Sequence, residues 1–452
     1  MIHRTVPTHT TTKEQSPMNI SSSQLSRRAF LGGGTALAAF GALALAGCAT
    51  PAAPGATAAA NAATKAKTIN FYGNSLGEEA LKPAWQAVLD DFSAEEGVTV
   101  SPVIYPYDQA ATQLALTGSA GKLMGVGQSG GWQVLTPMDV LADLTDLAKG
   151  LGIPQGVLDA YTMDGKLLVM PLTAAGIGII TNGEIAKSVG IKSGMTIEQF
   201  ATALEKIKSQ DSSLIPYAAV TKNPDLKDAA HWMWGFGSPV VTDDFECTIG
   251  DKESVKAITW YKSLQDEGLT QANVARADAR ILFASGRAAL YDDAPLASTF
   301  VKTNGAAQNI IDNIGAISRP TAGGNESYNR AWGSGLFASA GEGELTSRDF
   351  ITYAATNVEA ATAFYKQSAV APAAKSVADQ IPELAADKFQ TAFRTEVSEH
   401  ARGAAWDRVP VTAQIDAAIG AGVANILAGQ VDVQSGLNSL QKEVQGLLDA
   451  NA

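Results

Sequence analysis

The segment from 283 to 340 alternates short apolar runs with turn-forming residues, a pattern typical of α/β folds. A helical run ends at Gly286, where a residue without Cβ can take the left-handed cap. Ala288 to Tyr291 is then a short apolar strand, and Asn313 to Ser318 is a second one. A third apolar run follows from Ala331. The segment therefore predicts several strands of one sheet, connected by helices and turns.

Polar and aromatic residues lie at the ends of these predicted strands. Asp292 and Asp293 follow the first strand, and Trp332, Gly333 and Ser334 lie beside the third. Ligand-contacting residues of open α/β sheets gather just beyond the carboxyl ends of the strands. We therefore expect these five residues to be ligand-binding, with a carboxylate accepting hydrogen bonds from ligand hydroxyls. The alternative is that the two carboxylates cap the next helix at the surface.

The order of motifs in this segment resembles that of a known family. It comprises Phe-x-x-Gly-x-Ala-Ala-aliphatic at 283–290, the carboxylates, Asn-Ile-Gly-x-x-x-x-Pro at 313–320, Gly-Gly at 323–324 and Trp-Gly at 332–333. It resembles the extracellular solute-binding proteins of ATP-driven importers (family 1), and most of all their carbohydrate-binding, maltose-binding type. The resemblance implies an α/β, two-lobed periplasmic-binding-protein-like fold of type II, with a hinge of crossover strands. It also implies a sugar or oligosaccharide bound in the cleft, permease subunits as partners, and a monomer.

The first 48 residues predict an export signal rather than a folded part. A twin-arginine signature, Ser-Arg-Arg-Ala-Phe-Leu, occupies 26–31, and an apolar run continues to Ala46. That run is short for a membrane span, which needs about 20 apolar residues. Leu-Ala-Gly-Cys at 45–48 resembles the bacterial lipoprotein cleavage box, which would make Cys48 the lipidated first residue. We expect a protein anchored to the outer face of the cell membrane; an uncleaved N-terminal anchor is the alternative.

The remaining chain divides into a tether and two lobes. Ala49 to Lys67 is rich in Ala, Thr and Pro, which predicts a flexible tether. The rest exceeds what one hydrophobic core usually serves, so two lobes are expected. With the resemblance, the first lobe comprises 68–175 and 321–370, and the second 176–320 and 371–452.

Composition narrows the ligand class. The formal net charge is −12, which opposes binding to nucleic acid and to strongly anionic ligands and suits a neutral one. Only Cys247 remains once Cys48 is used, so no disulfide can form within the chain. His231 and His400 are the histidines after the leader, and they form no Cys/His cluster with metal spacing. We expect no metal and no cofactor.

Several helices are predicted by apolar spacing and capping residues. Trp85 and Trp260 lie inside helical apolar stripes and are expected in the core. Thr196 and Gln199 form a capping box at the start of another helix. Near the carboxyl end, Ile415 opens a buried stripe that repeats every three or four residues.

Further candidate binding residues lie near the ends of predicted elements. For Arg402 and Trp406, the resemblance implies that they reach the cleft from the C-terminal segment. Sugar rings stack their apolar faces on aromatic planes, while their hydroxyls need amides and carboxylates. The candidates are Asn74, Tyr107, Asp108, Gln128, Ser129, Trp132, His231, Trp232, Arg402 and Trp406. The alternative for each Trp is that it packs in the hydrophobic core and does not contact a ligand.

Catalytic interpretations are open beside the binding one. Gly-x-Ser-x-Gly at 127–131 matches the nucleophile elbow of an exported serine hydrolase using Ser129, although no His-Gly-Gly segment precedes it. Glycoside hydrolysis needs two carboxylates on either side of one bond, whereas Asp292 and Asp293 would point to opposite faces of a strand. Gly-x-Gly-x-x-Gly at 125–130 is a weak dinucleotide fingerprint. The sequence favours a binding protein that is not an enzyme, and an amine, a peptide or a glycerol phosphodiester is the alternative cargo.

Overall fold

The computed structural model describes residues 62–77, 81–106, 109–323 and 329–451. These belong to one unit, Ala59–Ala452. The predicted signal peptide, Cys48, and the candidate site residues Tyr107 and Asp108 lie outside the described residues. Among the helices in the described ranges, none is both long enough and apolar enough to cross a membrane.

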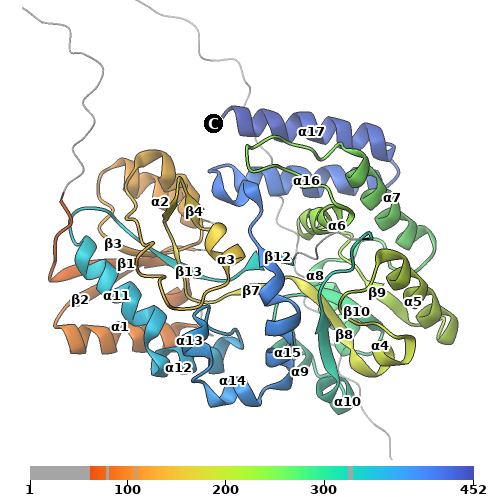
Figure 1. The fold of residues 1–452 in the computed structure, drawn as a ribbon, viewed down its shortest axis with the longest axis horizontal. Coiled ribbons are helices and arrows are strands. Elements are labelled where there is room, and N and C mark those ends of the chain that lie inside the picture. The colour runs from red at the N-terminus through yellow and green to blue at the C-terminus, as the bar shows by residue number, and fades with distance from the viewer. Residues whose placement is uncertain (1–61, 78–80, 107–108, 324–328, 452) are drawn as a thin grey trace, which may run out of the picture. The chain divides into compact units, whose positions relative to one another are not determined.

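The first sheet has the strand order β2-β1-β3-β13-β6 (Figure 1). The strands β1 (Thr68–Gly73), β2 (Thr99–Ile104) and β3 (Gly125–Gln128) pair in parallel, whereas β13 (Gly335–Ala338) runs antiparallel to both β3 and β6 (Met170–Pro171). The helices that follow or cover this sheet are α1 (Lys82–Glu96), α2 (Ala110–Ser119), α3 (Gln155–Asp159), α11 (Glu344–Thr356), α12 (Val358–Ser368), α13 (Lys375–Ala378) and α14 (Pro382–Ala386).

The second sheet has the order β11-β8-β10-β9. Its central strands β8 (Gly178–Asn182) and β10 (Ala288–Asp293) are antiparallel, with β11 (Ile314–Ile317) and β9 (Ile215–Ala218) at the edges. Its helices are α4 (Gly183–Val189), α5 (Ile197–Gln210), α6 (Ala229–Phe236), α7 (Lys252–Asp266), α8 (Arg276–Ala284), α9 (Ala297–Thr303), α10 (Gln308–Asp312), α15 (Lys388–Glu396), α16 (Thr412–Leu427) and α17 (Val433–Asp449).

Each sheet has its own hydrophobic core. Trp85 of α1 and Phe350 of α11 pack in the first, together with Val377 of α13. Phe200 of α5 and Ile415 of α16 pack in the second, which extends to α17. Val377 thus packs with the first core, seven residues beyond the predicted lobe boundary at 370.

A small three-stranded sheet connects the two parts. It has the order β14-β12-β7, formed by β14 (Ala401–Arg402), β12 (Asn329–Trp332) and β7 (Ala175–Gly176). The chain passes between the main sheets at β7 and β12, which are crossover strands of the hinge, whereas β14 lies between α15 and α16 of the second part and pairs with β12. Gly333 sits at a close approach there, because a Cβ on it would lie 2.2 Å from the Thr173 carbonyl oxygen.

Local predictions are confirmed where the sequence gave a stereochemical reason. Gly286 follows α8 with a φ of 72°, as the left-handed cap requires. The Thr196–Gln199 capping box is present at α5, with both reciprocal hydrogen bonds. Trp85 is buried as expected, whereas Trp260 is only partly buried against the second core.

The end of the predicted tether is attached to the first lobe. Thr64 exchanges backbone hydrogen bonds with Gly341 and Leu345, and Ala66 bonds through both backbone atoms to the Thr346 hydroxyl. Lys65 also forms an ion pair with Asp349. These contacts show that residues 64–66 are held by the start of α11, unlike the flexible segment predicted for 49–67.

Candidate functional site

A cavity of about 700 Å³ lies among residues from both main parts of the fold and from the crossover. Its volume falls in the range that small-molecule sites occupy. The first part contributes α3 and the residue after it, and the second contributes α6 and the loop that follows. The crossover contributes the segment around β14. The lining residues are Gly156, Asp159, Ala160, Trp234, Pro239, Val241, Thr242, Asp243, Glu399, His400, Ala401, Arg402, Gly403, Ala404, Ala405 and Arg408.

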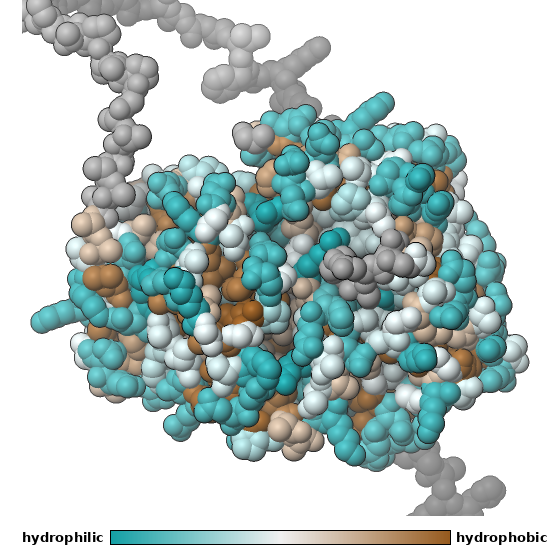
Figure 2. All heavy atoms as spheres, viewed as in Figure 1, coloured by the Kyte–Doolittle hydropathy of each residue, from teal (hydrophilic) through white to brown (hydrophobic). Residues whose placement is uncertain are grey.

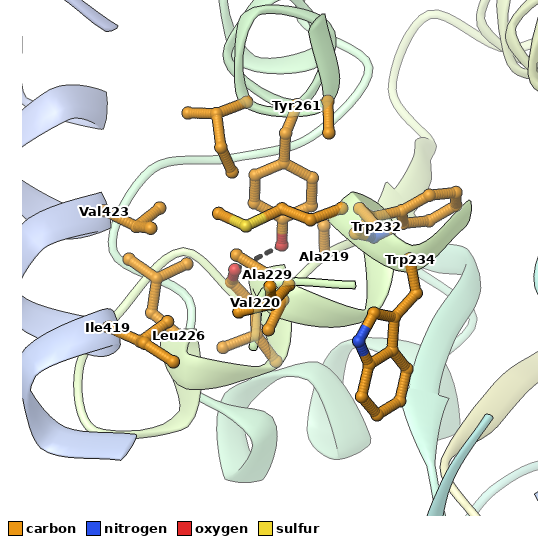
Figure 3. Packing of buried hydrophobic residues seen from close by; sticks show 14 of the residues in the cluster. Ala219, Val220, Leu226, Ala229, Trp232, Trp234, Tyr261, Ile419 and Val423 are labelled. Atoms are coloured by element: carbon orange, nitrogen blue, oxygen red, sulfur yellow. Dashed lines mark hydrogen bonds between the residues drawn. The ribbon is translucent and has the colours of Figure 1, made fainter. Parts of the chain in front are cut away.

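Trp234 is the indole at this cavity. It leaves α6 on a different side from Trp232, which points into the core (Figure 3). The Trp234 Nε1 atom donates a 3.1 Å hydrogen bond to the Pro239 carbonyl. Its ring lies 5.7 Å from that of His231, and the Arg402 guanidinium lies 4.6 Å from its centroid. These neighbours leave Trp234 only 4% exposed.

The polar rim carries both signs of charge. Arg408 pairs with Asp243 at 2.9 Å, and its guanidinium also lies over the Phe245 ring. Asp159 accepts a hydrogen bond from the Gln155 amide at 2.7 Å. Because the lining includes both carboxylates and arginines, it offers hydrogen-bond acceptors and donors and carries charges of both signs. This arrangement suits an uncharged ligand with many hydroxyl groups.

The predicted residues Asn74 and Gln128 meet at the end of the first sheet. The Gln128 Oε1 atom accepts from the backbone N–H groups of Asn74 and Ser75, at 3.0 and 3.1 Å. Its Nε2 donates to the Ser75 hydroxyl at 2.6 Å. Gln128 is 8% exposed, so in this conformation its amide holds the turn after β1.

Ser129 and Trp132 lie in the same part of the molecule. The Ser129 hydroxyl accepts a 3.1 Å bond from the Gly335 N–H. It also bonds to the Tyr161 hydroxyl, whose pKa rises to about 12 because burial disfavours its charged form. Trp132 is buried against the Tyr161 ring. Next to it, Gln133 donates to the Asp407 carbonyl at 2.9 Å, which joins the first lobe to the segment beyond the crossover.

Asp292 and Asp293 are the last residues of β10 and are both buried in ion pairs. Asp292 bonds to Arg319 at 2.7 Å and accepts the Tyr217 hydroxyl. Asp293 receives a bidentate bond from Arg280, at 2.7 and 2.8 Å. Their separate partners agree with side chains on opposite faces of the strand. The cavity described above does not include either carboxylate.

Two candidates on α6 are buried beneath the cavity. Trp232 is 1% exposed among aromatic rings of the second core, with the Arg319 guanidinium 4.6 Å from its centroid. His231 is fully buried, and neither of its ring nitrogens hydrogen-bonds to any residue that the structure describes. Burial, opposed by Asp228 3.8 Å away, lowers the pKa of His231 to about 3, so the imidazole is neutral.

The remaining candidates belong to the crossover region. Trp406 is fully buried, and its Nε1 donates to Asp416 at 2.9 Å. Arg402 lines the cavity. The backbone of Trp332 pairs with Ala175, and the Ser334 hydroxyl lies 3.0 Å from that of Thr173. The predicted ligand roles of all these residues stay predictions.

Trp234, His400 and Arg408 are cavity residues that the list of expected binding residues lacks. Helix geometry contained part of the signal. Residues two apart on an α-helix point about 200° apart, so Trp232 and Trp234 leave the helix in different directions. Both rings pack in the second core, but only Trp234 also lines the cavity. The sequence does not say which of the two lies at the cavity, since that depends on how α6 packs on the sheet.

The chemistry of the described residues gives the catalytic alternatives little support. The two described histidines are the core residue His231 and the exposed cavity residue His400, whereas the Ser129 hydroxyl is bonded to Gly335 and Tyr161. In the ranges that the structure describes, no group of three or more His, Cys, Asp or Glu side chains could hold a metal ion.

The chain is similar to several known binding proteins. A binding protein of Brucella abortus (strain 2308) is 25% identical over 258 residues, which is 54% of this chain and 62% of that protein. The chain therefore spans less than two thirds of the length of this curated relative.

Two solved structures are similar in fold. The sugar-binding protein MalE of Xanthomonas citri superposes with a TM-score of 0.73 at 17% identity, over 85% of this chain and 98% of that one. The GacH receptor of Streptomyces glaucescens superposes with a TM-score of 0.69 at 19% identity, over 85% and 99%. These likenesses confirm the predicted two-lobed periplasmic-binding-protein-like fold. The model of the bacterial extracellular solute-binding proteins matches residues 87–392. Because this match covers more than half of the chain, the protein belongs to the bacterial extracellular solute-binding protein family.

Proposed function

We propose that the protein captures a neutral sugar or oligosaccharide in the cavity around Trp234 and delivers it to an ATP-driven importer. The observation that carries this proposal is the combination of one indole with a charge-balanced polar rim in a cavity of about 700 Å³. An indole suits the apolar face of a sugar ring, and the lining carboxylates and the Arg408 guanidinium suit its hydroxyls. The relatives support the class of cargo, because one is named a sugar-binding protein and another was solved with acarbose.

The mechanism would be ligand-driven closure. The cavity is lined by residues of both lobes, so a bound ligand contacts both and favours the conformation in which they are close. Crossover strands of a few residues can absorb such a motion as a hinge. The importer's membrane subunits would then recognise the closed form. No covalent step is involved, and the proposal includes no enzymatic activity.

A thermal-shift screen tests the cargo. Ligand at 100 times its Kd adds about 2.7 kcal/mol of stability, which is readily seen as a raised midpoint. We expect neutral mono- or oligosaccharides to raise the midpoint, and amines, peptides and glycerol phosphodiesters to leave it unchanged. The cargo assignment is wrong if only one of the latter classes raises it.

A pair of Trp variants tests the site. Trp234→Leu is expected to abolish the sugar-dependent shift while circular dichroism shows the fold retained. Trp260→Leu is the matched control, because Trp260 is partly buried against the same core but does not line the cavity. Equal loss of binding in both variants would show that the effect is structural and would remove Trp234 from the site.

The anchor is a separate part of the proposal. We propose that export follows the twin-arginine signature and that lipidation of Cys48 holds a monomer at the outer face of the membrane. Cys48→Ser is expected to move the protein from the membrane fraction to the medium or periplasm. Retention of Cys48→Ser in the membrane would favour the uncleaved anchor instead.

A further inference from the structure

We propose that Arg402 covers the Trp234 indole in the ligand-free protein and that the cargo displaces it. This inference rests on the proposed function of the cavity and adds a regulatory role for one residue of its wall. The guanidinium carbon lies 4.6 Å from the ring centroid. A sugar ring that stacks on the indole needs carbon contacts at about 3.5–4 Å, which is the space that the guanidinium fills. Both groups cannot occupy the same face of the ring.

The burial of Trp234 shows that a cover is present. Its side chain lines the cavity and yet is only 4% exposed. The neighbouring rings of His231 and Trp406 lie 5.7 and 5.9 Å away and are themselves fully buried. Since Arg402 is partly exposed and lines the cavity, it is the neighbour on the solvent side. Exposing the indole to a ligand therefore requires Arg402 to move.

The two partners belong to different elements of the fold. Trp234 is fixed by its helix and by the hydrogen bond from Nε1 to the Pro239 carbonyl. Arg402 has a long flexible side chain on β14, a strand of two residues in the crossover. Its backbone pairs with Arg330 of β12, a crossover strand. Movement of these strands would change the position of Arg402 relative to Trp234. Hinge motion would thereby be coupled to exposure of the indole face that binds the sugar.

The cover predicts that removing the guanidinium strengthens binding. An arginine–indole contact contributes about 0.5–2 kcal/mol. At 1.4 kcal/mol per factor of ten, a ligand that must displace this contact has its Kd raised about 2- to 30-fold. Arg402→Ala should therefore lower Kd by that factor. Arg402→Lys, which keeps the charge but lacks the flat guanidinium, should give a smaller decrease. A residue that held the cargo would show the opposite result, because its loss would raise Kd.

The experiment measures binding and indole exposure in the full mature chain. Titration calorimetry with maltose, cellobiose and D-glucose gives Kd for the wild type, Arg402→Ala and Arg402→Lys. Arg394→Met is the control for loss of a positive charge, since Arg394 lies on α15 in an exposed pair with Asp379. Acrylamide quenching of tryptophan fluorescence without ligand measures the exposure of the Trp234 indole. The signal of the same protein carrying Trp234→Phe is subtracted, so that only the Trp234 contribution remains.

The expected result is tighter sugar binding and stronger Trp234 quenching in Arg402→Ala, with Arg394→Met like the wild type. An unchanged or raised Kd in Arg402→Ala overturns the inference while leaving the sugar function standing. Unchanged quenching also overturns it. If no sugar binds any of the proteins, the proposed function fails, and displacement by a sugar fails with it.

Discussion

The neutral buried imidazole of His231 makes the stability of this protein depend on pH in a calculable way. The change that tests this is His231→Leu, which replaces the ring with an apolar side chain of similar size. Neither ring nitrogen hydrogen-bonds to a described residue, so the substitution removes no hydrogen bond that the structure shows. We therefore expect it to cost less than about 1.5 kcal/mol at pH 7.5.

The size and sign of the effect follow from the two pKa values. Burial lowers the pKa of His231 to about 3; Asp228 opposes this shift, whereas Arg319, Arg330 and Arg276 add to it. In the unfolded chain the pKa returns to about 6.5. Between these values the unfolded state binds one more proton, so stability falls as pH falls, by about 1.4 kcal/mol per pH unit. At pH 5 the wild type should have lost about 2 kcal/mol through this group alone.

Urea unfolding at pH 7.5 and pH 5 measures the effect. The difference in unfolding free energy between His231→Leu and the wild type should shift by about 2 kcal/mol in favour of the variant on going to pH 5. Asp228 does not titrate between pH 5 and pH 7.5, because its buried carboxyl is paired with Arg276 and has a pKa below its usual range. The change in stability over this range therefore reports on His231. His400→Gln is the control for removing an exposed imidazole. A difference that is the same at both pH values would refute a buried neutral His231.

Three further changes test the packing of the two lobes. Asp292→Asn removes the carboxylate that neutralises the buried Arg319, so we expect the free energy of unfolding, measured with urea, to fall by about 3–5 kcal/mol. An unchanged free energy of unfolding would contradict a buried ion pair. Gly125→Ala places a Cβ 2.2 Å from a β1 carbonyl at a φ of +127° and should cost on the order of 3 kcal/mol and most of the soluble yield. Gly121→Ala is the control, because its φ is +64° and nothing lies within 4 Å of the added Cβ, and it should cost only about 1 kcal/mol. Equal soluble yields of the Gly125→Ala and Gly121→Ala proteins would contradict the close contact at Gly125. Gln133→Leu removes one hydrogen bond between the lobes and should shift the ligand-free population about 2- to 12-fold toward a more open form, seen as a larger radius of gyration by X-ray scattering.

Much of the fold could be predicted because its signals are local. Gly286 and the Thr196 capping box define helix ends through backbone stereochemistry, and the structure has both. Apolar spacing likewise predicted the buried stripe that starts at Ile415. The expectation of two lobes came from the chain length, but their arrangement came from the resemblance, since no local pattern says that β13 returns to the first sheet beside β3.

The candidate site was harder to predict because side-chain roles depend on distant partners. Asp292 lies where a ligand-binding carboxylate was expected, at the end of a strand. Arg319 reaches it from the segment after β11, and Tyr217 from the neighbouring strand β9. A carboxylate at a strand end looks the same in sequence whether its partner is a ligand hydroxyl or an arginine of the same chain. Only the register of β8, β10 and β11 brings that arginine within reach.

The position of the cavity links ligand capture to the hinge. Residues 399–405, which surround β14, line the cavity, and β14 pairs with the crossover strand β12. Just beyond them, Asp407 accepts Arg330 of β12 through its carboxylate and Gln133 of the first lobe through its carbonyl. Under the proposed function, a ligand that displaces groups in the cavity wall would therefore act on a segment that contacts both the crossover strand β12 and the first lobe. The same few residues can recognise the cargo and report its presence, with no need for a signal to cross either hydrophobic core.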